Sequence, residues 1–466
     1  MSRSLWNLLV CAFIGVLFCC SGAVRASASA SSLAKAVYGD DLEAVEKVVD
    51  ELVQAGGKKG AEAIFKVALS SRLDIEPEAY EILLKGLARL TDPAAMEFYS
   101  KMLKSRQVPP RILVVEAAAR MQGTTGVDLI LAGLKDKENS VVETALEAVR
   151  KRRPKEAVPV LIDLVEAWTK RRAKDAVYYN IKDTLIELTG EDLPSVDDWR
   201  KWWEVNSATF DPKKIREAKR TARKRVLGGK EDPTFFGVPV SSKNAVFVID
   251  TSASMLLVQK DDIPGLTKVR GVDVTEVVEQ PKERMTPENA RLAKYWTRIE
   301  MAKRQLCKVL GQLKPPTKIN IIAFNSKVFP FSKRSRTVTS SVKKKAIKWV
   351  RNLRPRAYTD TLGALKAAFA SDSKVNTIYF LSDGVPSKDG KTVDDMKEIL
   401  NKVLKMNRFR KIKIHTFGFH PFTMDGFPNP QLQQANKFLK ELASKTGGTF
   451  TAMKVDPNEK PPPDFR

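Results

Sequence analysis

The stretch NAVFVIDTSASM, residues Asn244–Met255, decides the fold of the second half of the chain. It opens with a mostly apolar run, which is typical of a buried strand. An acid and two hydroxyls then follow at alternate positions, as Asp250, Ser252 and Ser254. Because residues i and i+2 of an extended segment face the same way, these three side chains can point at one ion. The stretch therefore predicts a strand whose end carries polar ligands.

From residue 243 to about 455, strand-like runs such as KINIIAFNSKV and NTIYFLSDG alternate with helical patterns. This alternation predicts an α/β fold with a doubly wound, mostly parallel sheet. Ligands of such sheets bind beyond the carboxyl ends of the strands. Two later loops reach the same edge: RAYTDTLGAL carries Thr359 and FLSDG carries Asp383.

Together the three loops supply two carboxylates and three hydroxyls, from Asp250, Ser252, Ser254, Thr359 and Asp383. An all-oxygen set of this kind favours a hard cation, Mg²⁺ in particular, with Ca²⁺ and Mn²⁺ as alternatives. In the competing interpretation, Asp250 caps the next helix and the serines satisfy turn amides. We expect no catalytic residues, because no Ser/His/Asp or Cys/His set suggests itself.

These motifs resemble the von Willebrand factor type A (vWA) domain over residues 243–455. DTSAS matches its D-x-S-x-S loop, Thr359 its threonine loop, and Asp383 in LSDG its second aspartate. KTGGTF matches the usual approach to the last strand. The resemblance implies a metal-ion-dependent adhesion site in which the serines bind the ion directly and the aspartates bind directly or through water. The threonine joins when ligand is bound, and one position stays open for a partner's carboxylate.

One departure from the family is an insert of about 40 residues, 256–296, after the serine loop. Family members usually reach the first helix within a few residues. The insert emerges beside the metal site, so we hypothesise that it forms part of the ligand-binding surface or a lid. The alternative is a variable peripheral loop.

Residues 33–206 are predicted to be helical, because apolar residues recur at three- and four-residue spacing. Helical pairs are predicted to repeat with their second helices about 31 residues apart, which is typical of stacked helix pairs. The region resembles HEAT-like repeats, and the alternative is a non-repetitive helical bundle. Trp199, Trp202 and Trp203 are expected to close the end of the stack.

The two ends and the middle of the chain carry other signals. Residues 1–28 read as a secretory signal, with an apolar run and a small-residue cleavage site, or else as an uncleaved anchor. We therefore expect export to the periplasm, the cell surface or the extracellular space. Residues 207–242 are interpreted as a basic linker, and the tail, 456–466, as disordered because it is rich in proline and polar residues.

The net charge of +25 favours acidic partners. The leading prediction is an exported, non-enzymatic binding protein that holds an acidic group of a partner through the cation. That partner is either a protein presenting a carboxylate or an acidic cell-surface polymer; nucleic acid is disfavoured, and a membrane is expected only if the signal stays uncleaved. The alternatives are a charge-driven polyanion-binding or envelope-scaffolding protein with a purely structural metal, and an accessory subunit that delivers substrates to an enzyme.

Overall fold

The computed structural model describes residues 28–170, 174–215, 229, 232–258, 286–387, 389, 394–419, 430–453 and 462. The chain divides into two compact units, one of residues 1–167 with 184–223 and one of 168–183 with 224–466. No helix in the described ranges is long and apolar enough to cross a membrane. Most of the predicted signal (1–27), most of the insert (259–285) and most of the tail lie outside the described residues, as do 216–228 of the linker.

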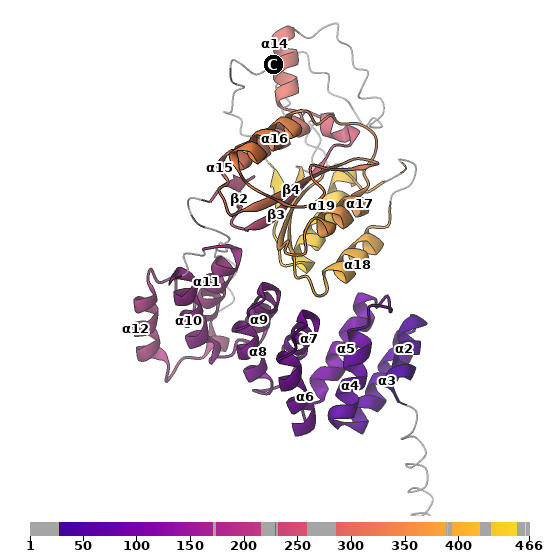
Figure 1. Ribbon diagram of the computed structural model, residues 1–466, viewed down its shortest axis with the longest axis vertical. Helices are drawn as coiled ribbons and strands as arrows, with labels where there is room; N and C mark the ends of the chain where they lie inside the picture. The colour runs from indigo at the N-terminus through magenta and orange to yellow at the C-terminus, as the bar shows by residue number, and fades with distance from the viewer. Residues whose placement is uncertain are drawn as a thin grey trace, which may run out of the picture. The chain divides into compact units, whose positions relative to one another are not determined.

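The helical region is arranged in two rows of stacked helices (Figure 1). In one row α3 packs on α5, α5 on α7 and α7 on α9, and in the other α2 packs on α4, α4 on α6 and α6 on α8. This is the packing of helical repeats, as the sequence predicts. The helices are α2 (Ala30–Tyr38), α3 (Leu42–Ala55), α4 (Gly57–Ala68), α5 (Pro77–Arg89), α6 (Pro93–Leu103), α7 (Val108–Ala118), α8 (Val127–Leu134), α9 (Asn139–Arg152), α10 (Ala157–Lys170), α11 (Ala176–Thr189) and α12 (Val196–Asn206), followed by a 3₁₀ turn, η2 (Pro212–Lys214).

The repeat period is also visible in two ion pairs that join helices of neighbouring repeats. Arg89 pairs with Asp50 and Arg120 with Glu81, in each case with an acid 39 positions earlier in the chain. The two arginines stand 31 positions apart, which matches the spacing predicted from the apolar pattern. Arg150 pairs in the opposite direction, with Glu187. Exposed pairs such as the first contribute little to stability, so the core leucines and valines hold the stack and the ion pairs record its period.

The second part of the chain forms a sheet with strand order β5-β4-β3-β7-β8-β9, and β6 pairs with β4. The strands β4, β3, β7, β8 and β9 are parallel to one another, whereas β5 and β6 run antiparallel to β4. The doubly wound, mostly parallel sheet is therefore confirmed. The strands are β3 (Asn244–Asp250), β4 (Lys318–Phe324), β5 (Val328–Pro330), β6 (Arg336–Thr337), β7 (Thr377–Leu381), β8 (Lys413–Phe419) and β9 (Phe450–Met453).

Helices cover both faces of this sheet (Figure 1). Alternate residues of β3 point to opposite faces, so Phe247 packs with α15 and α16, and Val248 packs with α17, α18 and α19. The two hydrophobic cores fix β3 rigidly in the middle of the domain. The helices are α14 (Pro287–Tyr295), α15 (Arg298–Gln312), α16 (Ser340–Arg351), α17 (Thr361–Ala370), α18 (Met396–Asn407) and α19 (Pro430–Lys445), with a 3₁₀ turn, η3 (Ala253–Leu256), after β3.

Part of the stretch interpreted as a linker packs into the hydrophobic core that also contains Phe247. Residues Thr234–Phe235 (β1) and Val238–Pro239 (β2) form a small antiparallel hairpin. Phe235 is fully buried, and its ring lies 5.0 Å from that of Phe417 and 5.6 Å from that of Phe247. The hairpin thus contributes an aromatic side chain to one face of the sheet.

Candidate metal centre

The carboxyl end of β3 lies where the strand order of the sheet reverses. β4, the next long strand in the chain, pairs on one side of β3, and β7 pairs on the other. Open α/β sheets bind ligands at such a switch point. Asp250 is the last residue of β3, and Asp383 follows the end of β7 by two residues. The topology therefore brings the two carboxylates to one place.

Short hydrogen bonds join the predicted ligands of the serine loop. Asp250 Oδ1 accepts from the backbone N–H of Ser252 at 2.7 Å. The hydroxyl oxygens of Ser252 and Ser254 lie 3.0 Å apart, and Ser254 Oγ donates to Asp383 Oδ1 at 2.7 Å. Asp250, Ser252 and Asp383 are buried, while Ser254 is half-buried. Four of the five predicted residues thus form one connected cluster.

Thr359 reaches the same cluster from the loop before α17. The backbone N–H of Ala253 donates to the carbonyl of Ala357 at 3.0 Å, which fastens this loop to the serine loop. A β-carbon placed on Gly384 would lie 3.5 Å from Thr359 Oγ1 and 3.7 Å from Ser254 Oγ, so both hydroxyls face the same small space. The structure therefore brings all five predicted residues together.

The backbone of the threonine loop is held in an uncommon conformation. Ala357 has a φ of 60°, in the left-handed region that residues with a β-carbon seldom adopt. Such backbone strain persists where surrounding bonds impose it, and it gathers at functional sites. Here the bond from Ala253 and the pairing of Thr359 with Ser387 fix the loop on both sides. The neighbouring Asp360 caps α17, where its side chain accepts from the N–H of Gly363 at 2.9 Å.

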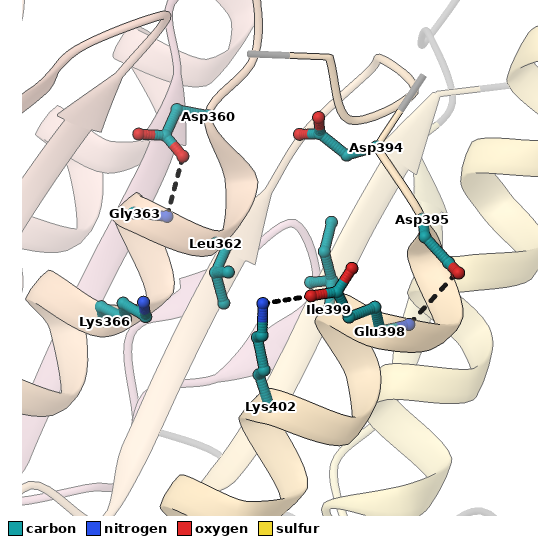
Figure 2. A pocket seen from close by; sticks show the side chains of 9 residues that line it. All are labelled: Asp360, Leu362, Gly363, Lys366, Asp394, Asp395, Glu398, Ile399 and Lys402. Atoms are coloured by element: carbon teal, nitrogen blue, oxygen red, sulfur yellow. Dashed lines mark hydrogen bonds and ion pairs between the residues drawn. The ribbon is translucent and has the colours of Figure 1, made fainter. Parts of the chain in front are cut away.

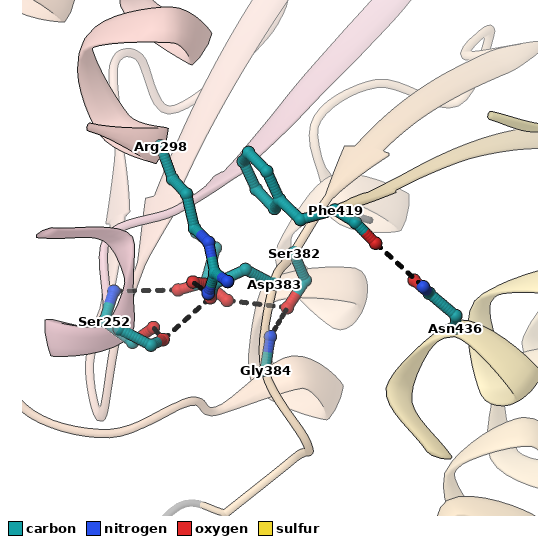
Figure 3. Close-up of polar contacts among 9 residues, drawn as sticks. Ser252, Arg298, Ser382, Asp383, Gly384, Phe419 and Asn436 are labelled. Carbon is teal, nitrogen blue, oxygen red and sulfur yellow. Dashed lines mark hydrogen bonds and ion pairs between the residues drawn. The ribbon is translucent and has the colours of Figure 1, made fainter. Parts of the chain in front are cut away.

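Two further residues, which the sequence motifs do not mark, contact the carboxylates (Figure 3). Ser382 Oγ donates to Asp250 Oδ2 at 2.6 Å. Arg298, the first residue of α15, donates from Nη1 to Asp383 Oδ2 at 2.6 Å, and both side chains of this ion pair are buried. Ser382 stands beside Asp383 in the motif and could have been included on that ground. Arg298 follows the long insert, and no local pattern distinguishes it from the other basic residues.

The cluster places two carboxylates in a buried environment. Burial, and then the nearby charge of Asp383, raises the pKa of Asp250 to about 7. Low-dielectric surroundings and a second carboxylate both disfavour the ionised form. A cation between the acids would offset both effects, because its positive charge stabilises the two ionised carboxylates.

The ligand set fits a hard divalent cation. In an octahedral site with Mg²⁺–oxygen bonds of about 2.05 Å, neighbouring ligand oxygens lie about 2.9 Å apart, and the two serine hydroxyls are separated by 3.0 Å. The described ranges hold no group of three or more His, Cys, Asp or Glu side chains suited to a metal. The candidate site is of another kind, since it combines two carboxylates with three neutral hydroxyls.

A neighbouring pocket of about 390 Å³ lies between the beginnings of α17 and α18 (Figure 2). Its acidic residues serve the helices. Asp360 caps α17, Asp395 accepts from the N–H groups of Lys397 and Glu398 at the start of α18, and Glu398 pairs with Lys402. Helix starts favour such residues through unpaired N–H groups and the helix dipole. These three acids are thus accounted for without a ligand.

Comparison with known proteins agrees with this fold. Residues 293–452 match the model of the von Willebrand factor type A domain. The chain therefore contains a vWA domain, and this domain follows a region of helical repeats. The matched range includes Thr359 and Asp383, whereas Asp250, Ser252 and Ser254 precede it and join the domain through β3.

Two proteins of Homo sapiens are similar to this domain. The chain is 30% identical over 169 residues to von Willebrand factor A domain-containing protein 3B, and 33% identical over 105 residues to protein 3A. These matches cover 36% and 22% of the chain but only 12% and 8% of the relatives. A solved structure, von Willebrand factor type A from Catenulispora acidiphila, aligns at 13% identity and a TM-score of 0.31, over 47% of this chain and 40% of that one.

Proposed function

We propose that the vWA domain binds a divalent cation, Mg²⁺ in particular, and uses it to hold a carboxylate of a protein partner. The carrying observation is the convergence of three hydroxyls and two carboxylates at the ends of β3 and β7. The residues that would hold the cation are Asp250, Ser252, Ser254, Thr359 and Asp383. When bound, the cation supplies a Lewis-acidic position that attracts an anionic oxygen.

The choice of ligands supports binding to an acidic group. Neutral hydroxyls leave more of the cation's charge uncompensated than carboxylates would, and this charge favours an incoming anion. The basic surface adds attraction at longer range, since the chain carries a net charge of +25. Arg354 and Arg356 are exposed in the loop that leads to Thr359, and the backbone N–H of Arg356 donates to the carbonyl of Thr251 in the serine loop at 2.8 Å.

Exposed apolar side chains beside the site favour a protein partner over an acidic polymer. Leu256 is 41% exposed and follows the second serine by two positions, and Tyr358 is 43% exposed and directly precedes the threonine. Among the described residues, these are the large hydrophobic side chains of the vWA domain that stand out in solvent. Exposed apolar groups near a polar site are typical of protein interaction surfaces. A highly charged polysaccharide would leave them without partners.

We propose a binding role without catalysis. The described cysteine and histidine support this view, because neither lies free to act as a nucleophile or base. Cys307 packs against the hydrophobic core, and burial raises the pKa of its thiol. His415 lies within β8, where Nδ1 is 2.8 Å from Thr449 Oγ1. Export remains part of the proposal on the strength of the signal-like residues 1–28.

A metal titration tests the proposal directly. Isothermal titration of the chain with Mg²⁺ and Mn²⁺ should give one site, which Asp250→Ala should abolish. A pull-down of partners from cell-surface extract should then be lost with EDTA and with Asp250→Ala. If the chain binds neither ion, or if partner binding survives EDTA, the proposal is wrong.

The charge-driven alternative keeps one supporting observation, the large positive net charge. If it holds, binding to a polyanion survives EDTA and falls steeply as salt is raised, because released counterions drive such association. Binding through the cation should instead depend on the metal at every salt concentration. The two functions are thus separated by one matrix of EDTA and salt conditions.

A further inference from the structure

We infer that Arg298 sets the charge of the metal-loaded centre. With this arginine the loaded centre has one net positive charge, which a single carboxylate of the partner balances. This inference rests on the proposed function, because it describes how the same site selects its partner group. The observation that carries it is the buried contact of Arg298 Nη1 with Asp383 Oδ2 at 2.6 Å (Figure 3).

The position of Arg298 is fixed from several sides. Its backbone N–H donates to the carbonyl of Leu257 at 3.0 Å, which ties the start of α15 to the segment that leaves the serine loop. Its guanidinium carbon lies 5.0 Å from the ring centre of Phe419, a buried residue at the end of β8. Figure 3 shows this ring beside the guanidinium, with the Phe419 carbonyl held by Asn436. The guanidinium of Arg298 is therefore a fixed, buried part of the site and does not reach over it from the surface.

Arg298 is committed to one acid. In the described part of the chain its ion pair is with Asp383, and its Nε is buried without a hydrogen-bond partner. Both oxygens of Asp383 are engaged, Oδ2 by Arg298 and Oδ1 by Ser254. Arginine keeps its charge under all physiological conditions, so this charge is a permanent part of the centre.

The charges of the centre can be counted from these contacts. Two ionised carboxylates and one guanidinium leave a single negative charge, and a divalent cation converts it into a single positive charge. Without Arg298 the loaded centre would have no net charge, and its attraction to an anion would be weaker. With it, one monovalent carboxylate completes the balance. Because the groups are buried, each unit of charge weighs more than it would in water.

This role differs from a structural one in the direction of its effects. Arg298→Met should strengthen Mn²⁺ binding, because a positive charge near the cation is removed. The same variant should weaken the grip of the loaded centre on a carboxylate, by about tenfold to a hundredfold. A residue that only supports the fold would weaken both when replaced.

The experiment uses the full chain saturated with Mn²⁺. The probe is acetyl-glutamate amide, which has one carboxylate. Water-proton relaxation reports displacement of manganese-bound water by the probe, and calorimetry gives the Mn²⁺ affinity. We expect the Asp383→Asn variant to bind the probe more tightly than the unmodified chain does, and the Arg298→Met variant to bind it more weakly. The double variant Arg298→Met/Asp383→Asn should return to within about threefold of the unmodified chain, because it restores the net charge.

Arg304→Met serves as the matched control, since it also removes a guanidinium from α15. The guanidinium of Arg304 lies over the ring of Tyr295. It should leave the probe affinity within about twofold, because its charge lies outside the cluster. The double variant also guards against misfolding, because replacing both members of a buried ion pair avoids an unpaired charge. A probe affinity in the double variant reduced tenfold or more, or Arg298→Met weakening both ligands in a folded chain, would overturn the inference. Absence of Mn²⁺ binding by the unmodified chain would instead refute the proposed function.

Discussion

Ser254 and Asp383 are joined by a 2.7 Å hydrogen bond although 129 positions separate them in the chain. The bond connects the loop after β3 with the loop after β7, so it links the two halves of the candidate metal centre. Because the serine hydroxyl is also a predicted metal ligand, its removal should both break the link between the two loops and take away one ligand.

We therefore predict that Ser254→Ala lowers Mg²⁺ affinity by about 10- to 100-fold, the usual cost of losing one supporting group of a metal site. Isothermal titration checks this result. Replacement of the exposed Ser373, in the loop before β7, provides the control and should leave affinity unchanged. Equal affinities in the two variants would show that the hydroxyl does not serve the cation.

Mg²⁺ binding should depend on pH because the pKa of Asp250 is raised to about 7. The cation must displace the proton, so affinity should fall about tenfold between about pH 8 and about pH 6. The metal-free fold has the opposite dependence. A carboxyl whose pKa is higher in the folded state stabilises the protonated fold, and this contribution is lost as pH rises through 7. Calorimetry and thermal melts at both pH values measure the two trends, and a flat affinity profile would contradict them.

Tyr358→Ala and Leu256→Ala should weaken partner binding and leave Mg²⁺ affinity unchanged. Their side chains are 43% and 41% exposed beside the ligand loops and contribute no oxygen to the predicted set. A loss of about 1 to 2 kcal/mol in partner affinity is expected for an interface residue of this size. Unchanged partner binding would indicate that the bound group is recognised through its charge alone, as an acidic polymer would be.

Phe235→Ala should destabilise the vWA domain by about 3 to 5 kcal/mol, the range for truncating a buried aromatic side chain. Phe235 is fully buried against Phe417 and Phe247. Chemical unfolding with guanidinium measures the loss, and Phe236→Ala, which removes the less buried neighbour, is the comparison. The same result would place the start of the domain before residue 243, because the hairpin would then be part of its core.

The predicted ligands could be read from sequence because their signal is local. Asp250, Ser252 and Ser254 alternate directly after an apolar strand, and Asp383 follows another, so a general rule about sheet edges joins them. Arg298 carries no such signal: it is one arginine among many at a helix start, and only the packing of α15 shows which acid it meets. The same limit applies to Phe235, because its contacts come from strands far along the chain.

The strand expected over KINIIAFNSKV shows how turn chemistry modifies an apolar pattern. The structure ends β4 at Phe324 and starts the antiparallel β5 at Val328. Asn325 makes the turn, since its side chain accepts from the N–H of Lys327 at 2.9 Å while its own N–H donates to the carbonyl of that residue. Asparagine followed by serine is a turn signal, and it outweighs the continuity of the hydrophobic run.

The distance along the chain between the serine loop and Asp383 has a consequence for synthesis. A ribosome must produce the chain beyond β7 before the second carboxylate can meet the first, so a nascent chain that stops short of that strand lacks one of the two acids of the candidate site. Under the proposed function, loading of the cation would consequently be a late event that follows the pairing of the central strands.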